Sequence, residues 1–300
     1  MPGAFGGAEP LFLLLIALAI EAYVGDRPFR FRWVPHPRRL VARLVGGLEQ
    51  RLDRPERTPG QRRLRGLIVA AGLALAALAV GWLVALFTRH YPFAWTLEVF
   101  VLVMLVAQRS SARRVGAVRA ALAEGSLVRA RAALAPLAAG RLAPAMVERL
   151  EAPGLVVASV AALGRQFAAR LVGPVLWYVV LGLPGIFLQQ VSLVLGEGPG
   201  SRDSAFGRAP AVLAAAISLP PRALAGLVIA AAALFIPGAR PAPAALSAVR
   251  APGAPETALA VALGPVPGPA GLVRALAIFA VACLIDAGLV ALVALLRLIL

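Results

Sequence analysis

Lysine and asparagine are absent from this 300-residue sequence, and cysteine occurs once, at Cys283. Without lysine the chain cannot form a Walker A phosphate loop or a lysine Schiff base, because both depend on the lysine amine. A single cysteine also excludes a disulfide framework and a zinc site built from thiolates. Acidic residues are scarce as well: 14 stand against 30 basic residues, all of them arginine, which gives a formal net charge of +16.

Apolar residues dominate what is present. They make up 60% of the chain, the mean hydropathy is +0.85, and only 15% of residues are charged. Soluble domains carry about 25% charged residues, and disordered chains lack this apolar bulk. The composition therefore excludes an ordinary soluble enzyme. It predicts an all-α, polytopic integral membrane helical bundle with amphipathic cytoplasmic helices, which we expect to form one domain over residues 1–300.

Six apolar runs are candidates for membrane spans. A span needs about 20 predominantly apolar residues to cross the hydrocarbon core. The predicted spans cover residues 10–24, 67–87, 93–107, 171–195, 223–236 and 272–296. The fourth contains Pro174 and Pro184, which we expect to kink or break it.

The arginines orient these spans. Most of them fall in residues 26–64 and 108–170, on either side of the hairpin predicted from the second and third spans, so both segments share one face. By the positive-inside rule this face is cytoplasmic, which predicts a multi-pass protein of the cell (inner) membrane whose basic loops meet anionic lipid headgroups. The arginines lack interleaved aromatic residues, so we expect no nucleic-acid partner.

Two segments between the spans differ in character. Residues 108–134 carry small apolar residues at helical spacing between arginines, which predicts one or two amphipathic helices divided near Gly125. Residues 237–270 are rich in proline and glycine and show no strong period. They read as a loop or linker, with room for a short helix over Glu256–Leu263.

Carboxylates inside apolar runs are costly, so each is a candidate for function. Glu21 falls at the cytoplasmic edge of the first span, where it can pair with an arginine or serve a site. Glu98 lies near the opposite end of the third span, and Asp286 lies nearer the centre of the last one, where we expect it to face the bundle interior. His36 stands between two prolines, which fix an extended backbone suited either to presenting a ligand or to a plain connector.

Several short segments, taken in order, resemble the CobD/CbiB family, the adenosylcobinamide-phosphate synthases of cobalamin biosynthesis. An apolar run carrying Glu21 precedes the first of them. The segments are Gly25-Asp26-Arg27-Pro28, Pro35-His36-Pro37, Arg109-Ser110, Gly173-Pro174-Val175-Leu176-Trp177, Gly182-Leu183-Pro184-Gly185, Phe206-Gly207, Pro220-Pro221-Arg222 and Ala258 to Gly264. Their order and spacing carry the resemblance, which covers essentially the whole chain.

The resemblance implies a divergent ligase-type enzyme. Family members are credited with joining aminopropanol phosphate to a carboxylate of the corrinoid adenosylcobyric acid at the expense of ATP, with magnesium, giving adenosylcobinamide phosphate. Carried over to this chain, it implies Glu21, Asp26 and His36 as catalytic residues, and Arg38 and Arg141 as binding residues for phosphate groups. It implies no bound prosthetic group and leaves the oligomeric state open.

Several acidic residues of the family pattern are replaced in this chain. A Gly-Arg-Asp-Thr step appears as Gly140-Arg141-Leu142-Ala143, and an Asp-Asp pair falls on Leu213-Ala214. A Glu-Ser-Leu-Ala-Glu-Asn run followed by Asp-Gly falls on residues 161–166 and 169–170. Magnesium needs hard oxygen ligands, so these losses support an alternative. The chain would then be a non-catalytic paralogue that acts as a membrane partner, sensor or scaffold, in the manner of the regulator AmpE.

Overall fold

The computed structural model describes residues 9–24, 37–52, 58–91, 93–106, 109–139, 141–197, 204–251, 253–264 and 268–299. Within these ranges the chain is helical throughout and has no strand, which confirms the predicted all-α class. The α-helices are α1 Pro10–Val24, α2 Pro37–Leu52, α3 Pro59–His90, α4 Trp95–Leu105, α5 Arg109–Ala123, α6 Leu127–Ala138, α7 Pro144–Arg149, α8 Ala152–Phe167, α9 Gly173–Leu181, α10 Leu183–Glu197, α11 Arg208–Ala233, α12 Pro241–Arg250, α13 Pro255–Leu263 and α14 Pro269–Ile299. A π-helical segment, η1, joins α8 to α9 over Ala168–Val172.

Five helical stretches among the described residues are long and apolar enough to cross a membrane. They are Pro59–His90, Trp95–Ala123, which takes in α4 and α5, Ala152–Leu181, which takes in α8, η1 and α9, Arg208–Ala233 and Pro269–Ile299. Two shorter apolar helices accompany them, Pro10–Tyr23 and Leu183–Gly196. These lengths fit the expected polytopic membrane bundle, since about 20 residues of helix span the hydrocarbon core.

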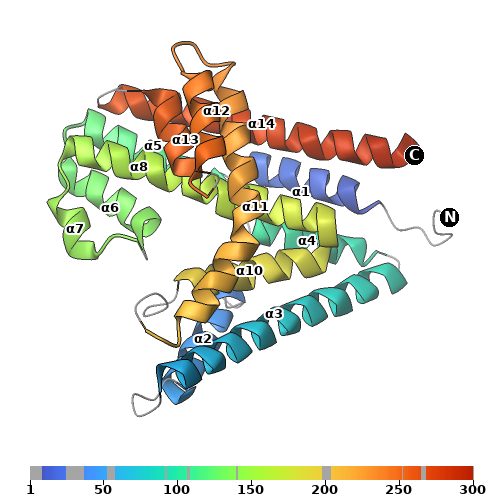
Figure 1. Ribbon diagram of the computed structural model, residues 1–300. Helices are drawn as coiled ribbons and strands as arrows, with labels where there is room; N and C mark the ends of the chain where they lie inside the picture. The colour runs from blue at the N-terminus through green and yellow to red at the C-terminus, as the bar shows by residue number, and fades with distance from the viewer. Residues whose placement is uncertain are drawn as a thin grey trace.

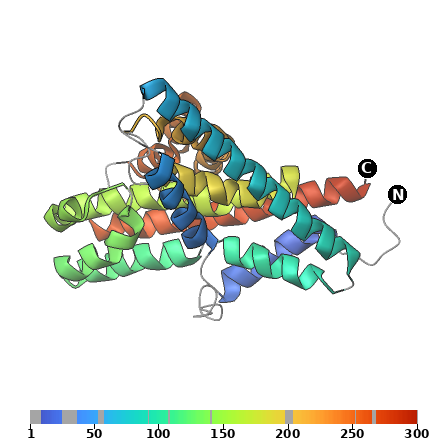
Figure 2. The same cartoon turned by 90° about the horizontal axis from the view of Figure 1, so that it is seen from below.

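The helices form a layered bundle in which α3 lies opposite α14. Figure 1 shows α14, α8 and α1 on one side, α3 on the other, and α10 and α11 between them; Figure 2 gives the same order from below. Thr58 caps the start of α3: its side-chain oxygen accepts a hydrogen bond from the Gln61 amide at 3.4 Å. Along α3 the large apolar side chains of Leu75, Trp82 and Leu83 are exposed, as expected of a helix that faces lipid.

The expected span 171–195 is divided between two helices. Gly182 separates α9 from α10 and has φ +69°, a left-handed conformation that residues with a side chain rarely adopt. A Cβ atom on Gly185 would lie 2.1 Å from the Trp177 carbonyl oxygen, so α10 begins in direct backbone contact with α9. The segment therefore forms two packed helices rather than one continuous span.

The prediction of a loop over residues 237–270 was wrong for much of its length. The structure places α12 over Pro241–Arg250 in this segment, and α13 begins at Pro255, close to the short helix that the sequence suggested. Both helices start at a proline. Proline has no backbone N–H, and in the first turn of a helix that N–H would have no acceptor within the helix, so proline is well tolerated there. The prolines thus mark helix starts rather than an absence of helix.

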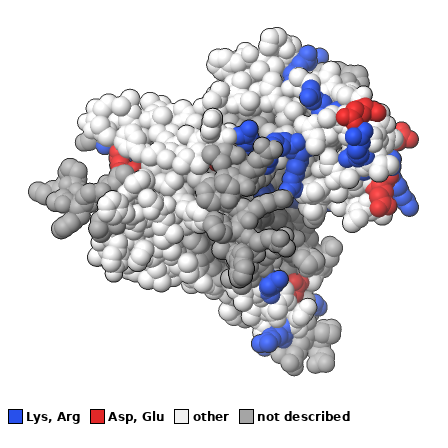
Figure 3. All heavy atoms as spheres, turned by 180° about the vertical axis from the view of Figure 1, so that it is seen from behind, with Lys and Arg blue, Asp and Glu red and all other residues white. Residues whose placement is uncertain are grey.

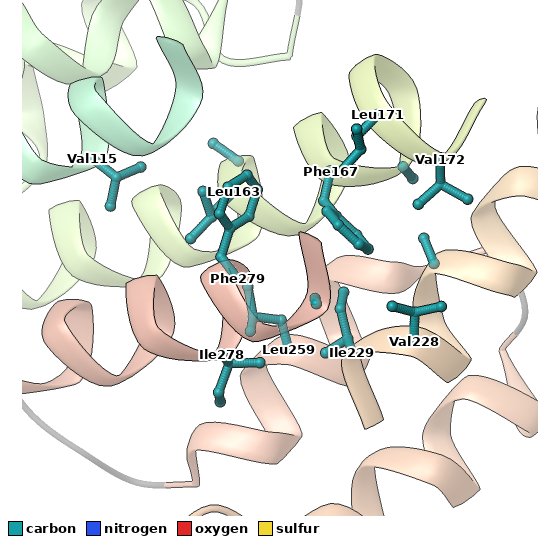
Figure 4. Packing of buried hydrophobic residues seen from close by; sticks show 14 of the residues in the cluster. Val115, Leu163, Phe167, Leu171, Val172, Val228, Ile229, Leu259, Ile278 and Phe279 are labelled. Carbon is teal, nitrogen blue, oxygen red and sulfur yellow. The ribbon is translucent and has the colours of Figure 1, made fainter. Parts of the chain in front are cut away.

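The main apolar core lies where α8, η1, α11, α13 and α14 meet. Figure 4 shows Phe167 and Leu163 from the end of α8 beside Phe279 of α14, with Ile229 of α11 close by. The rings of Phe167 and Phe279 are in edge-to-face contact with centroids 5.6 Å apart. This core holds the end of α8 and η1 firmly in place, and the polar residues of the same segment point to a neighbouring cavity.

Candidate functional site

A cavity of about 200 Å³ lies between the end of α8, η1, α10 and α11. The connection between α6 and α7 and the start of α13 complete its wall. Four arginines line it together with one amide and two hydroxyls: Arg141, Arg165, Arg170, Arg222, Gln166, Ser192 and Ser218. The rest of the wall is small or apolar, and none of the lining residues that the structure describes is acidic.

The helix that supplies Arg165, Gln166 and Arg170 changes its winding at the cavity. Arg165 and Gln166 lie in the last turn of α8, and Arg170 follows in η1. A π-helical turn is wider than an α-helical one, and such turns occur often at functional sites. The segment thereby presents two guanidinium groups and an amide to one cavity while Phe167 and Leu171 point into the core.

The face of α11 that meets the cavity follows ordinary helical spacing. Residues 211, 214, 215, 218 and 222 line the wall, at intervals of three and four that place them on one side of a helix. The first four are small, which leaves space, and Arg222 closes the row with a positive charge. Small residues at helical spacing before Pro220-Pro221-Arg222 were a usable sequence signal for this wall.

A carboxylate lies near one of the arginines without lining the cavity. Glu256, at the start of α13, attracts the Arg165 guanidinium, and Arg222 acts on Arg165 as a like charge. The approach of α13 is close: a Cβ atom on Gly164 would lie 2.8 Å from the Glu256 Cα atom. The site is thus strongly basic, and this nearby acid offsets part of its charge.

A small recess extends the basic surface toward α5. Ser110, Ser111 and Arg114 line it, and it shares Leu137, Gln166 and Arg170 with the main cavity. In Figure 3 basic side chains gather on the side of the molecule formed by α5 to α8 and again near the start of α3, while the broad remaining surface carries few charges. On this face the described basic side chains therefore lie in separate groups rather than evenly over the surface.

Glu21 holds the start of α5 beside this recess. Its Oε1 atom accepts a hydrogen bond from the Arg109 amide at 3.0 Å, and its side chain is buried. The Arg109 guanidinium in turn donates to the carbonyl oxygens of Ala22 and Tyr23. A carboxylate at a helix N-terminus satisfies amides that have no partner within the helix. Glu21 does not line the cavity, so its described contacts are those of a structural cap.

Of the five residues proposed from sequence, Arg141 is the one that the structure places in the cavity wall. Asp26 and His36 lie outside the described residues, and so does the side chain of Arg38, whose backbone lies in the first turn of α2. Sequence reasoning did not single out Arg165, Arg170 or Arg222. The sequence did carry a signal for this cavity, namely the positions at which the family pattern has an acid and this chain does not. Three of those positions, 165, 169 and 214, line the cavity.

The two other acids singled out from sequence lie away from the cavity, Glu98 half-buried and Asp286 buried. The Tyr178 hydroxyl donates to Glu98, and its oxygen also lies 3.1 Å from the carbonyl oxygen of Pro10, so three helices meet at this tyrosine. Asp286 is 2% exposed and faces the bundle interior, as its position in the last span suggested. Neither acid lines the arginine cavity.

The described residues do not fit magnesium. Mg²⁺ is bound through carboxylates, phosphates and water, whereas the charged groups of the cavity wall are all guanidinium groups. Within the ranges that the structure describes, no three His, Cys, Asp or Glu side chains gather as a metal site would need. The arrangement is instead that of an anion site, since arginine forks pair with phosphate and carboxylate oxygens.

Residues 14–266 match the protein family described as CobD/Cbib protein. A Sinorhizobium protein named Cobalamin biosynthesis protein CobD is 31% identical over 84% of this chain and 81% of its own length. Proteins of the same name from Rhizobium meliloti and Rhodobacter capsulatus are 30% and 29% identical, over 86% and 73% of this chain and 81% and 68% of their own lengths. No solved structure matches this chain.

Proposed function

The chain belongs to the CobD/Cbib protein family, and on this basis we propose that it acts in cobalamin biosynthesis. The reaction that we propose is amidation of the corrinoid adenosylcobyric acid with aminopropanol phosphate. A bond forms between the amine nitrogen and the carboxyl carbon, and the carboxyl oxygen leaves, taken up as phosphate when ATP is consumed. One of the two joined substrates carries a phosphate group, and the chain needs a place to hold it.

The arginine cavity is the observation that carries this proposal. Four guanidinium groups line about 200 Å³, with no acid among the described lining residues. Like charges this close repel one another, and an anion bound between them relieves the repulsion. Each arginine can give two parallel hydrogen bonds to phosphate oxygens, which fixes the orientation of the phosphate as well as holding it. The role of these residues is therefore to bind and orient the phosphate end of the amine substrate.

For activation of the carboxyl group we propose residues that the structure does not describe. Asp26 and His36 are our candidates for this step, because the resemblance carries both over and the described wall lacks a carboxylate. Their test is substitution of each by alanine. Loss of product with normal accumulation in the membrane supports the assignment, whereas wild-type turnover in both variants refutes it.

A second candidate function is supported by the same cavity. Arg165, Ala169 and Ala214 occupy positions at which the resemblance places acids, and all three line the wall. A protein that keeps the bundle and an anion site but lacks these carboxylates fits a non-catalytic paralogue, which would bind an anionic ligand as a membrane sensor or partner. The two candidates differ in turnover and share the binding site.

Complementation separates them. The full chain is expressed in a bacterial strain that lacks its own adenosylcobinamide-phosphate synthase, and growth is made to depend on newly made cobalamin. Growth supports the ligase. Absence of growth, with the protein present in the membrane, refutes the ligase and leaves the paralogue.

Variants then test whether the cavity is the site. Arg165→Gln and Arg222→Gln are compared at limiting expression with Arg119→Gln, a matched arginine that is exposed on α5 and does not line the cavity. The cavity variants are expected to grow at least tenfold less well, because each loses charge-assisted hydrogen bonds. Equal growth of all three variants would remove the cavity from the proposal.

A further inference from the structure

We propose that the arginine cavity binds the phosphate of a small phosphomonoester directly, without a divalent cation, and that nucleotides and the corrinoid ring stay outside it. The inference rests on the proposed function for the identity of the phosphate-bearing substrate, and on the cavity itself for everything else.

The charge of the cavity wall matches that of a phosphomonoester without a metal ion. A phosphomonoester carries close to two negative charges at neutral pH. Sites that bind such a group through magnesium provide carboxylates for the metal, and the described wall has none. Four arginines supply the positive charge that a metal would otherwise bring, and a cation entering among them would meet repulsion from all four.

The volume of the arginine cavity limits the size of the ligand. Pockets that enclose drug-sized ligands measure about 300–1,000 Å³. The arginine cavity, at about 200 Å³, falls below that range. It therefore suits a phosphate with a short carbon chain, and it is too small for a nucleotide or for a macrocycle. The amine end of such a ligand would project from the cavity, toward the place where a corrinoid carboxylate has to approach.

The lining also fits the two parts of such a ligand. Arg165, Arg170 and Arg222 come from two different segments, η1 with the end of α8 and α11, so a phosphate can be held from more than one side. Ser192 and Ser218 add hydroxyl groups, while Gly196, Ala211 and Ala215 leave an apolar wall against which a short carbon chain can pack.

A phosphate group could reach the cavity from solution or from a lipid headgroup, since the protein lies in a membrane. The two sources differ in chemistry. A phosphomonoester can carry two negative charges, whereas a phospholipid headgroup is a diester with one negative charge at its phosphate. Four guanidinium groups favour the more highly charged group. The experiment must nonetheless keep the two sources apart.

Binding is measured on the full-length protein in phosphatidylcholine nanodiscs by isothermal titration calorimetry. The probes are O-phosphoethanolamine, inorganic phosphate and ATP, each with EDTA and with magnesium. We expect O-phosphoethanolamine to bind equally well in both conditions, and ATP to bind at least tenfold more weakly. Loss of binding in EDTA, or ATP binding as tight as that of the monoester, would overturn the proposal.

Variants locate the binding, and a second lipid composition identifies the source of the phosphate. Arg165→Gln and Arg222→Gln should each weaken O-phosphoethanolamine binding about tenfold to a hundredfold, while Arg119→Gln leaves it unchanged. Unchanged binding in both cavity variants, with normal elution on size exclusion, would place the ligand elsewhere and overturn the proposal. In phosphatidylglycerol nanodiscs the monoester should still bind; its complete displacement would assign the cavity to lipid instead.

This result is independent of the complementation test. Binding without a metal, together with failure to support growth, would retain the inference and reject the ligase. Growth together with binding that requires magnesium would retain the ligase and reject the inference.

Discussion

A close contact between α3 and α10 gives the sharpest prediction about the stability of this protein. A Cβ atom on Gly81 of α3 would lie 2.5 Å from the Cα atom of Pro184 and 2.7 Å from its nitrogen. Both are backbone atoms at the start of α10, so no side-chain rotation can make room. Ordinary contact begins at 3.4 Å, so the two helices would have to separate by about 1 Å to admit the methyl group of Gly81→Ala.

The expected change in stability combines the cost of overpacking at Gly81 with the higher helix propensity of alanine. Overpacking of this kind costs about 1–3 kcal/mol. The matched control is Gly72→Ala on the same helix, where a Cβ atom meets nothing within 4 Å. There alanine should stabilise the helix by about 0.5–1 kcal/mol relative to glycine. The same gain applies at Gly81 and cancels in the comparison, so the two variants should differ by the overpacking cost of about 1–3 kcal/mol, which corresponds to roughly 2–6 °C in melting midpoint for a chain of this size.

The assay is the fraction of detergent-solubilised protein that still elutes as a single peak on size exclusion after heating across a range of temperatures. We expect Gly81→Ala to lose its peak at a lower temperature than the wild type, and Gly72→Ala to match or exceed the wild type. Because α10 supplies Ser192 and Leu193 to the cavity, anion binding should weaken along with stability. Equal midpoints for the two variants would show that α3 and α10 do not meet as described.

Three further predictions concern charge and orientation. Glu21→Ala removes the acceptor of the Arg109 amide and should lower accumulation of the protein in the membrane. Glu21→Gln keeps an acceptor and should preserve accumulation. Loss of growth in a Glu21→Gln variant that accumulates normally would instead indicate a catalytic carboxylate. Glu256→Gln removes the acid that offsets the charge of the cavity, so phosphomonoester binding should tighten by several-fold, and weaker binding would contradict this electrostatic account. In intact cells a membrane-impermeant thiol reagent should label Phe93→Cys, beyond the end of α3, but not Gln61→Cys, at its start; the reverse pattern would invert the proposed orientation.

Composition and periodicity were sufficient to predict the fold class. Apolar runs and arginine placement are properties of single segments, so the sequence alone predicts membrane helices and the division of residues 108–134 near Gly125, where the structure ends α5 and begins α6. Proline-rich segments were harder to interpret, because a proline that starts a helix and one that ends it look alike in sequence. The helix α12 was missed for this reason, and α11 runs through Pro220 and Pro221.

The cavity could not be predicted in the same way, because it depends on which helices meet. Arg165 and Arg222 are 57 positions apart in the sequence, yet they line one wall because α8 and α11 pack together. Arg141 was proposed through the resemblance, which supplied information about spatial neighbours that periodicity lacks. Glu21 was proposed in the same way, and the structure shows that the same position also serves as a cap for α5.

Three of the lost acids of the family pattern fall at one place in the molecule. Positions 165, 169 and 214 come from three separate segments, and all three line the arginine cavity. If the losses simply reflected decay of an unused site, nothing would require arginine to appear among them, and the remaining charges would be free to vary in sign. Instead Arg165 stands where the pattern has a glutamate, and Arg170 stands where it has a glycine. All charged side chains of the described wall are therefore positive. A wall that loses three acids, gains arginine at one of those positions and gains a second arginine in place of glycine favours a new preference, for an anion in place of a cation. That argues for a cavity in use, whether or not the chain retains the ligase reaction.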